Sequence, residues 1–405
     1  MVEIGLGVAS FTAIVLVLSL FVLGARRLLV PSGECEIDVN SRQSIIAPIG
    51  QRLLEVLAAA GIQLPSACGG AGTCGLCKAR VLSGGGEAGP QELAHMTRLE
   101  AARGVRLACQ VPVLRAMSVE VGETCFGVKT WECTVERVRN VSTLIREIVL
   151  KLPEGEEMDF RAGGFVQISC PPFQVSYSGF DIESAYRDVW DELGLRSLQV
   201  RNTKSVTRAY SMANHPAEKG VIILNVRIAL PPPGIKSAPP GVVSSWLFSL
   251  APGDEVQVTG PFGHFFVEQT DEEAVFIGGG AGMAPLRAQI LDLLETRKST
   301  RKITFWYGAR SKRELFYDQL FDRLQAKYEN FEWHVALSEP EQKDNWTGFT
   351  GFIHTVVLDN YLAHHASPEE CEYYLCGPPL MVKAVLAMLD DLGVEPENIH
   401  YDDFG

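Results

Sequence analysis

The chain opens with an uninterrupted apolar run. From Ile4 to Ala25, 22 residues carry no charged side chain, and the basic pair Arg26 and Arg27 follows the run. A helix rises about 1.5 Å per residue, so this run would reach about 33 Å, enough to cross the hydrocarbon core of a bilayer. A cleaved signal peptide carries its positive charge before a shorter run. The pattern therefore predicts one membrane-spanning anchor, with the rest of the chain on the cytoplasmic side.

Short strand-like segments dominate the middle of the chain. Gly, Pro and Asp turns separate them, which is typical of an antiparallel β-barrel or sandwich. The stretch between Cys170 and Thr207 is rich in aromatic residues but has no clear period, and we expect an elaborated surface loop there. The predicted strands are Thr134–Val138, Ile145–Leu150, Phe165–Ser169, Ala209–Ala213, Val221–Ile228 and Glu255–Thr259.

Strand and helix patterns alternate from Ala274 onward. Repeated β–α units imply a parallel sheet of the doubly wound kind, with helices on both faces. The predicted strands are Val275–Ile277, Ile303–Tyr307 and Tyr373–Cys376, and the helices that follow them are Pro285–Leu294, Glu314–Tyr328 and Pro379–Leu392.

These changes in sequence pattern divide the chain into four parts. We expect an anchor (1–30), a Gly-rich domain that carries a cysteine cluster (31–128), a β-barrel domain (129–270) and an α/β domain (271–405). The net charge of −13 argues against a nucleic-acid partner, which favours a basic face. Ten cysteines in 405 residues are too few for a disulfide scaffold, and four of them follow a pattern of metal ligands.

That pattern is C-x5-C-x2-C, formed by Cys68, Cys74 and Cys77, with Cys109 following 32 residues later. Four thiolates are what a [2Fe–2S] cluster requires, two on each iron. Glycines crowd the loop, and they leave room for backbone N–H groups to point at the sulfurs. Zinc is the main alternative, but zinc motifs usually pair two C-x2-C units and only one is present. A disulfide is disfavoured by the predicted cytoplasmic location.

Residues 33 to 125 resemble the plant- and vertebrate-type ferredoxins. The five-residue spacing between the first two cysteines is closer to the vertebrate type, and Leu107-Ala108-Cys109-Gln110 stands where that family supplies its last ligand. The resemblance implies a β-grasp fold with the cluster near the surface.

A second motif, Arg208-x-Tyr210-Ser211, begins a predicted barrel strand. The guanidinium of Arg208 suits a diphosphate, Tyr210 offers a flat face for a flavin ring, and the Ser211 hydroxyl suits a hydrogen bond to flavin N5. The alternative is an ordinary strand with one exposed arginine, which would have the same sequence. Further along, Gly241 and Ser244 stand at a turn that enters a helix, where N–H groups without partners favour phosphate.

Together with Gly260-Pro261-Phe262-Gly263, these motifs follow the order of the ferredoxin–NADP reductase family of FAD-binding barrels. The resemblance covers residues 130 to 405. It implies FAD as the cofactor, held by Arg208, Tyr210, Ser211, Gly241 and Ser244.

A glycine-rich loop follows the first strand of the α/β domain and precedes a helix. Gly278, Gly279, Gly280 and Gly282 would let a pyrophosphate approach the backbone at the helix N-terminus. Cys376-Gly377-Pro378 is the second marker of the reductase family, and the resemblance places Cys376 beside the nicotinamide C4. A buried structural thiol is the alternative for Cys376.

The C-terminal Phe404 matches the terminal aromatic residue of the same family. The resemblance implies that its ring covers the flavin face until nicotinamide displaces it, whereas an exposed aromatic tail could equally be packing. The catalytic set implied by the resemblance is thus Ser211, Cys376 and Phe404.

The residues alone do not decide between NADH and NADPH. Arg310, Lys312 and Arg313 follow the second strand of the α/β domain and suit a 2′-phosphate. Glu314 beside them would oppose one.

The order of the parts describes a converter from two-electron to one-electron chemistry, because NADH gives hydride, a [2Fe–2S] centre takes single electrons and a flavin does both. Soluble oxygenase reductases share the last three parts and are one alternative. An electron-carrier module with vestigial nucleotide binding is another. The anchor, the cysteine spacing, the insertion at 170–207 and the ending Tyr401-Asp402-Asp403-Phe404-Gly405 together resemble the F subunits of sodium-translocating NADH:quinone oxidoreductases.

This last resemblance implies NADH as the substrate, FAD and [2Fe–2S] as cofactors, and ubiquinone as the final acceptor, reached through other subunits of a complex in the cell inner membrane. Ion translocation would not reside in this chain, since one apolar helix without an ionisable residue offers no path.

Overall fold

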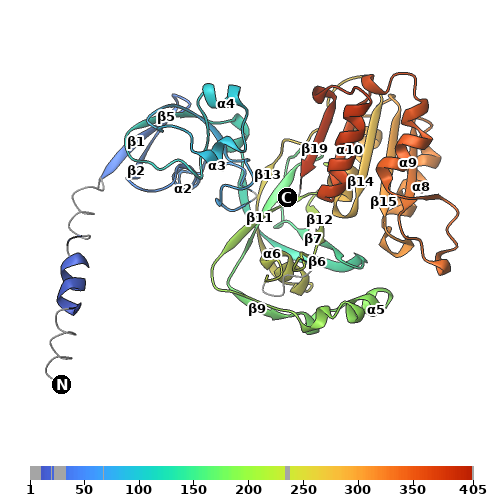
Figure 1. Ribbon diagram of the computed structural model, residues 1–405, viewed down its shortest axis with the longest axis horizontal. Coiled ribbons are helices and arrows are strands. Elements are labelled where there is room, and N and C mark those ends of the chain that lie inside the picture. Colours follow the sequence, from blue (N-terminus) through green and yellow to red (C-terminus); the bar gives the residue numbers. More distant parts are fainter. Residues whose placement is uncertain (1–10, 20, 22–32, 67, 233–237, 404–405) are drawn as a thin grey trace. The chain divides into compact units, whose positions relative to one another are not determined.

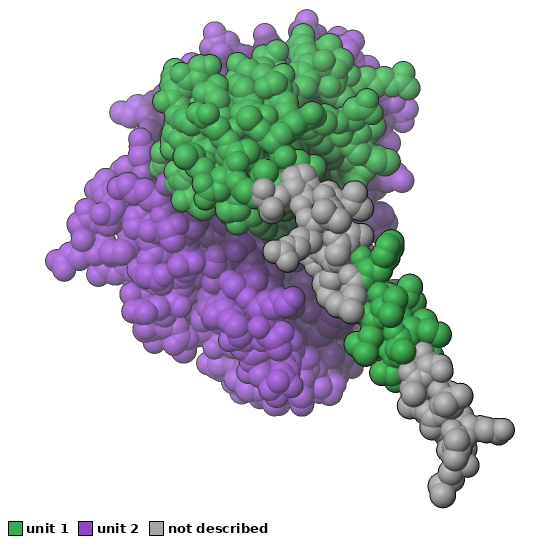
Figure 2. Space-filling view, turned by 90° about the vertical axis from the view of Figure 1, so that its left-hand side faces the viewer, with its two compact units in different colours: residues 1–127 green, residues 128–405 purple. Residues whose placement is uncertain are grey.

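The computed structural model describes residues 11–19, 21, 33–66, 68–232 and 238–403. The chain divides into two compact units, Met1–Gly127 and Val128–Gly405, which Figure 2 shows in green and purple. Residues 11–19 are helical. Within the described residues, no helix combines the length and apolarity that a bilayer crossing needs. Most of the predicted anchor, Ile4–Ala25, lies outside the described residues.

The first unit is built on a five-stranded mixed sheet with a helix against it. Strand β1 runs parallel to β5, and the other neighbours are antiparallel. Helix α2 (Leu53–Ala59) buries Leu53, Val56 and Leu57 in the core of this unit. The arrangement is the β-grasp fold that the ferredoxin resemblance implied. The strands, in sheet order, are β2 (Gln43–Pro48), β1 (Glu34–Val39), β5 (Met117–Glu120), β3 (Lys78–Ser83) and β4 (Val105–Leu107).

Two short helices, α3 (Pro90–Leu93) and α4 (Arg98–Ala102), lie between β3 and β4. A buried ion pair fixes α3, because Glu92 accepts two hydrogen bonds of 2.8 Å from the guanidinium of Arg106. The third guanidinium nitrogen, Nη1, donates to the carbonyls of Gly85 and Gly86. This network holds the segment between the last two cluster cysteines in one conformation.

The second unit begins with a six-stranded antiparallel sheet, in which all six predicted strands are confirmed. A bridge between Met212 and Leu224 connects the chain just after one edge strand to the other edge strand, and so curls the sheet toward closure. The order is β11 (Val206–Ser211), β8 (Phe165–Cys170), β13 (Glu255–Phe262), β6 (Lys129–Ser142), β7 (Ile145–Lys151) and β12 (Val221–Arg227).

The expectation of a surface loop between Cys170 and Thr207 is wrong. This segment forms a hairpin of β9 (Phe173–Ser176) and β10 (Gln199–Asn202) around helix α5 (Ser184–Glu192). Tyr177, Phe180 and Trp190 are buried in the barrel core against Phe248 of α6 (Val242–Ser249). These aromatic residues fill the core. They show no period in the sequence because each lies in a different local structure.

The remainder of the second unit is a six-stranded parallel sheet with helices on both faces (Figure 1). Phe276, Phe305 and Tyr374 pack on one face, and Val275 and Trp306 pack on the other. The strands, in sheet order, are β17 (Phe349–Thr350), β16 (Phe331–Leu337), β15 (Ile303–Ala309), β14 (Ala274–Gly279), β18 (Glu372–Gly377) and β19 (Ile399–Asp403). The helices are α7 (Met283–Leu291), α8 (Asp318–Lys327), α9 (Ile353–Asn360) and α10 (Pro379–Asp391).

Helix α8 starts later than predicted. The pattern placed its start at Glu314, but Glu314 ends a short 3-10 turn (Lys312–Glu314), and Tyr317 adopts a left-handed conformation at the N-cap of α8. The Glu314 carboxylate is turned to the barrel, where it accepts hydrogen bonds from Ser142 and Thr143. The tertiary contact outweighs the helical pattern at this point.

A buried ion pair joins the barrel to the parallel sheet. Arg287 of α7 donates to both carboxylate oxygens of Glu218, at 3.0 and 3.1 Å, and to the carbonyl of Ala213. His215 donates its backbone N–H to the same carboxylate. Burial raises the pKa of Glu218, but the hydrogen bonds from His215 and Arg287 outweigh it and lower the pKa to about 2.

We predict that Glu218→Gln lowers the free energy of unfolding of the second unit by about 2–3 kcal/mol at pH 7, because Arg287 loses its buried counter-charge. The folded pKa lies below the usual value of about 4.3, so this stabilisation is present above pH 4.3 and is lost as the pH falls toward 2. Urea denaturation across this range should show the wild type and the variant converging. The exposed Glu255→Gln serves as the control, with a change within about 0.5 kcal/mol. A constant difference down to pH 2 would contradict the assignment.

Candidate functional site

The four motif cysteines form two pairs in the first unit. The sulfurs of Cys68 and Cys74 lie 3.3 Å apart, and the thiols of Cys77 and Cys109 are hydrogen-bonded to each other. None of the ten cysteines, all of which lie in the described part of the chain, is in a disulfide. Two pairs of thiols match a cluster in which each iron takes two thiolates.

Backbone N–H groups converge on these sulfurs. Burial raises the pKa of Cys68, but N–H donors from Thr73 and Gly72 are among the hydrogen bonds that lower it to about 7. The hydrogen bond with Cys77 is the largest cause that lowers the pKa of Cys109 to about 6, and the N–H of Gly72 contributes there as well. The N–H of Gly72 therefore serves one cysteine of each pair, as a loop wrapped around an anionic cluster requires.

Gly72 has no room for a side chain. Its φ is +77°, and a Cβ would come within 2.5 Å of Gln110 Nε2 and 2.8 Å of Gln91 Nε2. Gln91 itself donates to the carbonyl of Ala71, at 3.1 Å. Two glutamine side chains thus pack against the outside of the loop, and the backbone N–H groups of the loop face the sulfurs. The residues fit a [2Fe–2S] cluster.

The flavin motif lies on edge strand β11. Arg208 is exposed and Tyr210 is half-buried, on the same side of the strand. Burial raises the pKa of Tyr210, so the phenol stays neutral. Ser211 is 8% exposed and donates a hydrogen bond of 3.0 Å to Asp402 of β19. The strand therefore presents a cation and a flat ring on one side and a hydroxyl at its end.

Gly241 is the N-cap of α6, as the motif predicted for a turn that enters a helix. The hydroxyl of Ser244 accepts from the N–H of Ala229 and donates to the carbonyl of Gly241, at 3.1 and 3.2 Å. A Cβ on Gly241 would lie 2.6 Å from the Cβ of Ala229. Ser244 thus fixes the turn, and the groups left for a phosphate are the first backbone N–H groups of α6.

The two nucleotide motifs pack against each other at the carboxyl edge of the parallel sheet. Gly278 of β14 is paired with Cys376 of β18. A Cβ on Gly282 would fall 2.0 Å from the Cys376 carbonyl, and one on Gly279 would fall 2.9 Å from the sulfur of Met381. Ligands of doubly wound folds bind at this edge of the sheet. Gly280 adds a φ of +57°, and its carbonyl accepts from Tyr307.

Four residues, two predicted and two newly found, lie together beside this edge. Cys376 is fully buried and stands next to Asp402 in the register of β18 and β19, while Asp402 bonds Ser211 of the barrel. His264 lies 4.0 Å from the other Asp402 oxygen. Sequence reasoning missed Asp402 and His264, because it predicted no strand after Cys376 and the pairing of β18 with β19 joins residues distant in sequence. Phe404 lies outside the described residues. Gly377 and Pro378 follow Cys376, and Pro378 is the N-cap of α10.

The basic residues near the predicted ribose end are paired with carboxylates. Arg310 lies 2.7 Å from Glu339, and Arg313 lies 3.0 Å from Asp188 and 3.3 Å from Glu341. Two of the three basic side chains that suit a 2′-phosphate are thus already neutralised.

Comparison with known families divides the chain as the motifs do. Residues 37–114 match the 2Fe-2S iron-sulfur cluster binding domain, residues 195–267 the oxidoreductase FAD-binding domain, and residues 276–387 the oxidoreductase NAD-binding domain.

Full-length relatives then decide the family. The chain is 56% identical over 403 residues to the F subunit of the Na(+)-translocating NADH-quinone reductase of Pseudomonas paraeruginosa, with 100% of this chain and 99% of the relative covered. It is 55% identical to the same protein of Methylococcus capsulatus, with all of both chains covered. The chain belongs to the family of Na(+)-translocating NADH-quinone reductase F subunits.

Solved structures show the same fold outside the F subunits. An Amycolatopsis cytochrome P450 reductase is 27% identical, with a TM-score of 0.66, and covers 91% of this chain and 98% of its own. The ferredoxin reductase in carbazole 1,9a-dioxygenase is 25% identical, with a TM-score of 0.60, and covers 93% and 99%. The F-subunit family thus shares its cluster, flavin and nicotinamide domains with oxygenase reductases.

We predict that Gly72→Ala lowers the cluster content, because the methyl group must push aside the ends of the Gln91 and Gln110 side chains that pack on the loop, at a φ that costs about 1 kcal/mol or more outside glycine. Iron and acid-labile sulfide per chain should fall below the wild-type values. Gly86→Ala is a matched control, with a φ of +69° and open space around its Cβ. Equal cluster content in both variants would show that the amide packing around Gly72 is irrelevant.

Proposed function

We infer that this chain oxidises NADH and feeds the electrons singly through its [2Fe–2S] cluster, as the electron-input subunit of a sodium-translocating NADH:ubiquinone reductase. The observation that carries this inference is the meeting of Ser211, Cys376 and Asp402 beside the glycine loops. A flavin-binding strand and a nicotinamide-binding edge adjoin there. Full-length identity of 56% to F subunits favours them over the oxygenase reductases, at 27%.

FAD would be held at the barrel. Arg208 would neutralise the diphosphate together with the N-terminus of α6, and Tyr210 would support the flavin ring. When bound, a flavin accepts a hydride and gives up electrons one at a time. Ser211 would donate its hydroxyl to the ring, after its hydrogen bond to Asp402 is shared or exchanged. The chain needs no nucleophile or general acid for this chemistry.

NADH would lie across the glycine loop. Gly282 and Gly279 keep the loop flat against the neighbouring strand, so that the pyrophosphate reaches the N-terminus of α7. Cys376, which is fully buried, would stand beside the nicotinamide and exclude water. The carboxylates already paired with Arg310 and Arg313 support NADH over NADPH, because a 2′-phosphate would have to displace them.

The electron would leave through the loop around Cys68. Gly69, Ala71 and Thr73 are exposed there, whereas Cys77 is fully buried. Small uncharged side chains let an acceptor approach the sulfur of Cys68 closely. This supports an exit toward a partner protein of the complex at this loop.

We also propose the boundaries and location suggested by the sequence. These are a single-pass anchor at 1–30 in the cell inner membrane, a ferredoxin domain at 31–128, an FAD domain at 129–270 and an NADH domain at 271–405, all three facing the cytoplasm. The uncharged run from Ile4 and the two arginines that follow it support the anchor. Sodium translocation would belong to partner subunits.

We predict that Cys77→Ala separates the two halves of the reaction. NADH oxidation with a soluble two-electron acceptor should stay within about twofold of the wild type, whereas reduction of one-electron partners fed by the cluster should fall by at least about 100-fold. Steady-state assays with both classes of acceptor test this. Cys133→Ala is the control, since Cys133 is equally buried but lies in the barrel. Equal loss of both activities would mean that the cluster is structural.

We predict that Ser211→Ala retains FAD but slows its reduction by NADH about 10- to 100-fold, the effect of losing one hydrogen bond to a group that becomes charged. Stopped-flow absorbance of the flavin measures the rate, and the bound FAD is quantified after denaturation. Ser169→Ala, which removes a hydroxyl that faces Thr207 in the same barrel, should react at the wild-type rate. An unchanged rate in Ser211→Ala would remove this residue from the site.

A further inference from the structure

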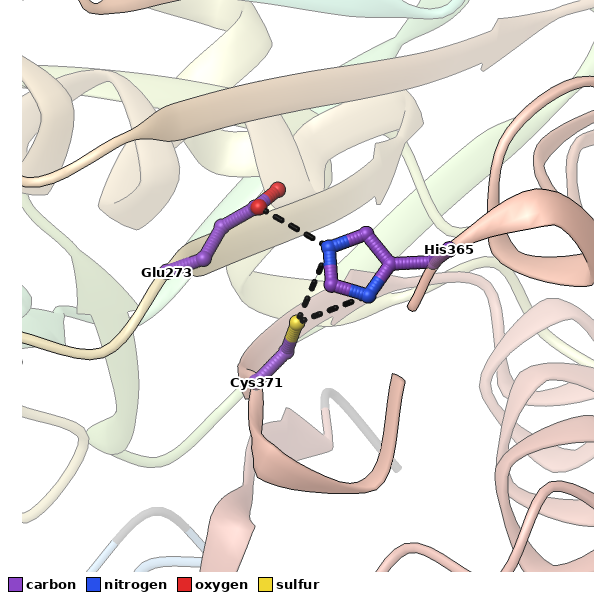
Figure 3. Close-up of side chains that lie close together, drawn as sticks. All are labelled: Glu273, His365 and Cys371. Atoms are coloured by element: carbon purple, nitrogen blue, oxygen red, sulfur yellow. Dashed lines mark hydrogen bonds and ion pairs between the residues drawn. The ribbon is translucent and has the colours of Figure 1, made fainter. Parts of the chain in front are cut away.

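A second group of chemically active side chains lies at the opposite edge of the parallel sheet. Glu273 stands directly before β14, Cys371 directly before β18, and His365 directly after the 3-10 turn Leu362–His364. The glycine loops follow the other ends of β14 and β18. Figure 3 shows the three side chains directed toward one another.

Their atoms are spaced like ligands of one ion. His365 Nε2 lies 3.2 Å from Glu273 Oε2 and 3.9 Å from Cys371 Sγ, and the three ligand atoms lie within 4.8 Å of one another. A tetrahedral ion at about 2.0–2.3 Å from nitrogen, oxygen and sulfur sets its ligands about 3.3–3.8 Å apart. Cys371 is 2% exposed, and the His365 side chain is 20% exposed, so one side of the group stays open to water.

The surrounding charges favour a cation. The carboxylates of Glu272, Glu332 and Glu369 lie near the group and add negative charge to it. The basic residue Lys302 lies beside them and adds positive charge. The Lys302 ammonium lies 3.5 Å from Glu273 and donates a hydrogen bond of 2.5 Å to the Tyr361 hydroxyl, so an ion at Glu273 Oε2 must displace this half-exposed side chain.

We propose that Glu273, His365 and Cys371 form a binding site for one divalent ion of the zinc class, with water as the fourth ligand. A thiolate, an imidazole and a carboxylate together select zinc over magnesium or calcium, which take oxygen ligands. The site is separate from the four cluster cysteines, which lie in the other compact unit.

Binding has a defined proton balance. A zinc-class ion binds cysteine as the thiolate, so the proton of the Cys371 thiol passes to solvent. The N–H of Ser367 donates to His365 Nδ1 at 3.2 Å, which places the ring proton on Nε2, toward Glu273. An ion at Nε2 moves that proton to Nδ1 and costs the hydrogen bond from Ser367. One proton is released for each ion bound.

The position implies stabilisation rather than catalysis. The three ligands tie together the starts of β14 and β18 and the segment after α9, all of them away from the edge where nucleotide would bind. An ion there would raise the thermal midpoint of the second unit and leave NADH oxidation unaltered.

The test is a zinc titration of the full chain loaded with FAD and its cluster, in competition with a chromophoric chelator. The wild type should bind one zinc ion with release of one proton. Cys371→Ser and His365→Gln should each bind it at least about 100-fold more weakly, as expected for the loss of a ligand. Cys133→Ser and Cys376→Ser, which alter buried thiols elsewhere, should keep it. Flavin content and far-ultraviolet circular dichroism establish that each variant is folded.

X-ray absorption at the zinc edge distinguishes the sources of binding. One sulfur at about 2.3 Å with lighter ligands at about 2.0–2.1 Å supports the site, whereas four sulfurs would indicate zinc in the cluster loop and overturn the proposal. Equal zinc content in the wild type and in both ligand variants would overturn it as well. If Cys371→Ser fails to fold, the His365→Gln comparison and the zinc-edge spectrum of the wild type decide alone.

Discussion

One buried cation, Arg287, ties the barrel directly to the glycine loop. Arg287 lies on the helix that follows this loop and donates to a carboxylate and a carbonyl of the barrel, next to the flavin strand. The distance between two cofactors decides whether hydride can pass, and a shift of about 1 Å is costly. The hydrogen bond from Ser211 to Asp402 joins the same two parts at the candidate site.

Motifs with a fixed spacing could be predicted from the sequence. The cysteine pattern, the glycine loop and the alternation of strands and helices each follow from local rules about ligands, phosphates and periodicity. Their structural contexts agree, from the paired thiols of Cys68 and Cys74 to the packing of Gly282 on Cys376. The residues of each motif are neighbours in sequence, which is why a single sequence is enough to predict these sites.

Contacts between distant residues could not be predicted in this way. Nothing near Trp190 in sequence shows that its ring fills the barrel core, and nothing near Cys371 shows that His365 and Glu273 lie beside it. Cys371 has no motif around it, so its sequence context suggests only a buried thiol. Asp402 belongs with these residues, because neither its strand nor its partner on the barrel was predicted.

Much of this protein's chemistry depends on glycines, which have no side chain. At Gly72, Gly241 and Gly282 a single added methyl group would come within 3 Å of neighbouring atoms, in the cysteine loop at the first and at helix starts at the other two. Reactive residues are few by comparison. Random mutations would therefore inactivate the protein mostly by adding side-chain volume at such glycines. The positions that tolerate the fewest substitutions would be those whose residues have no reactive side chain.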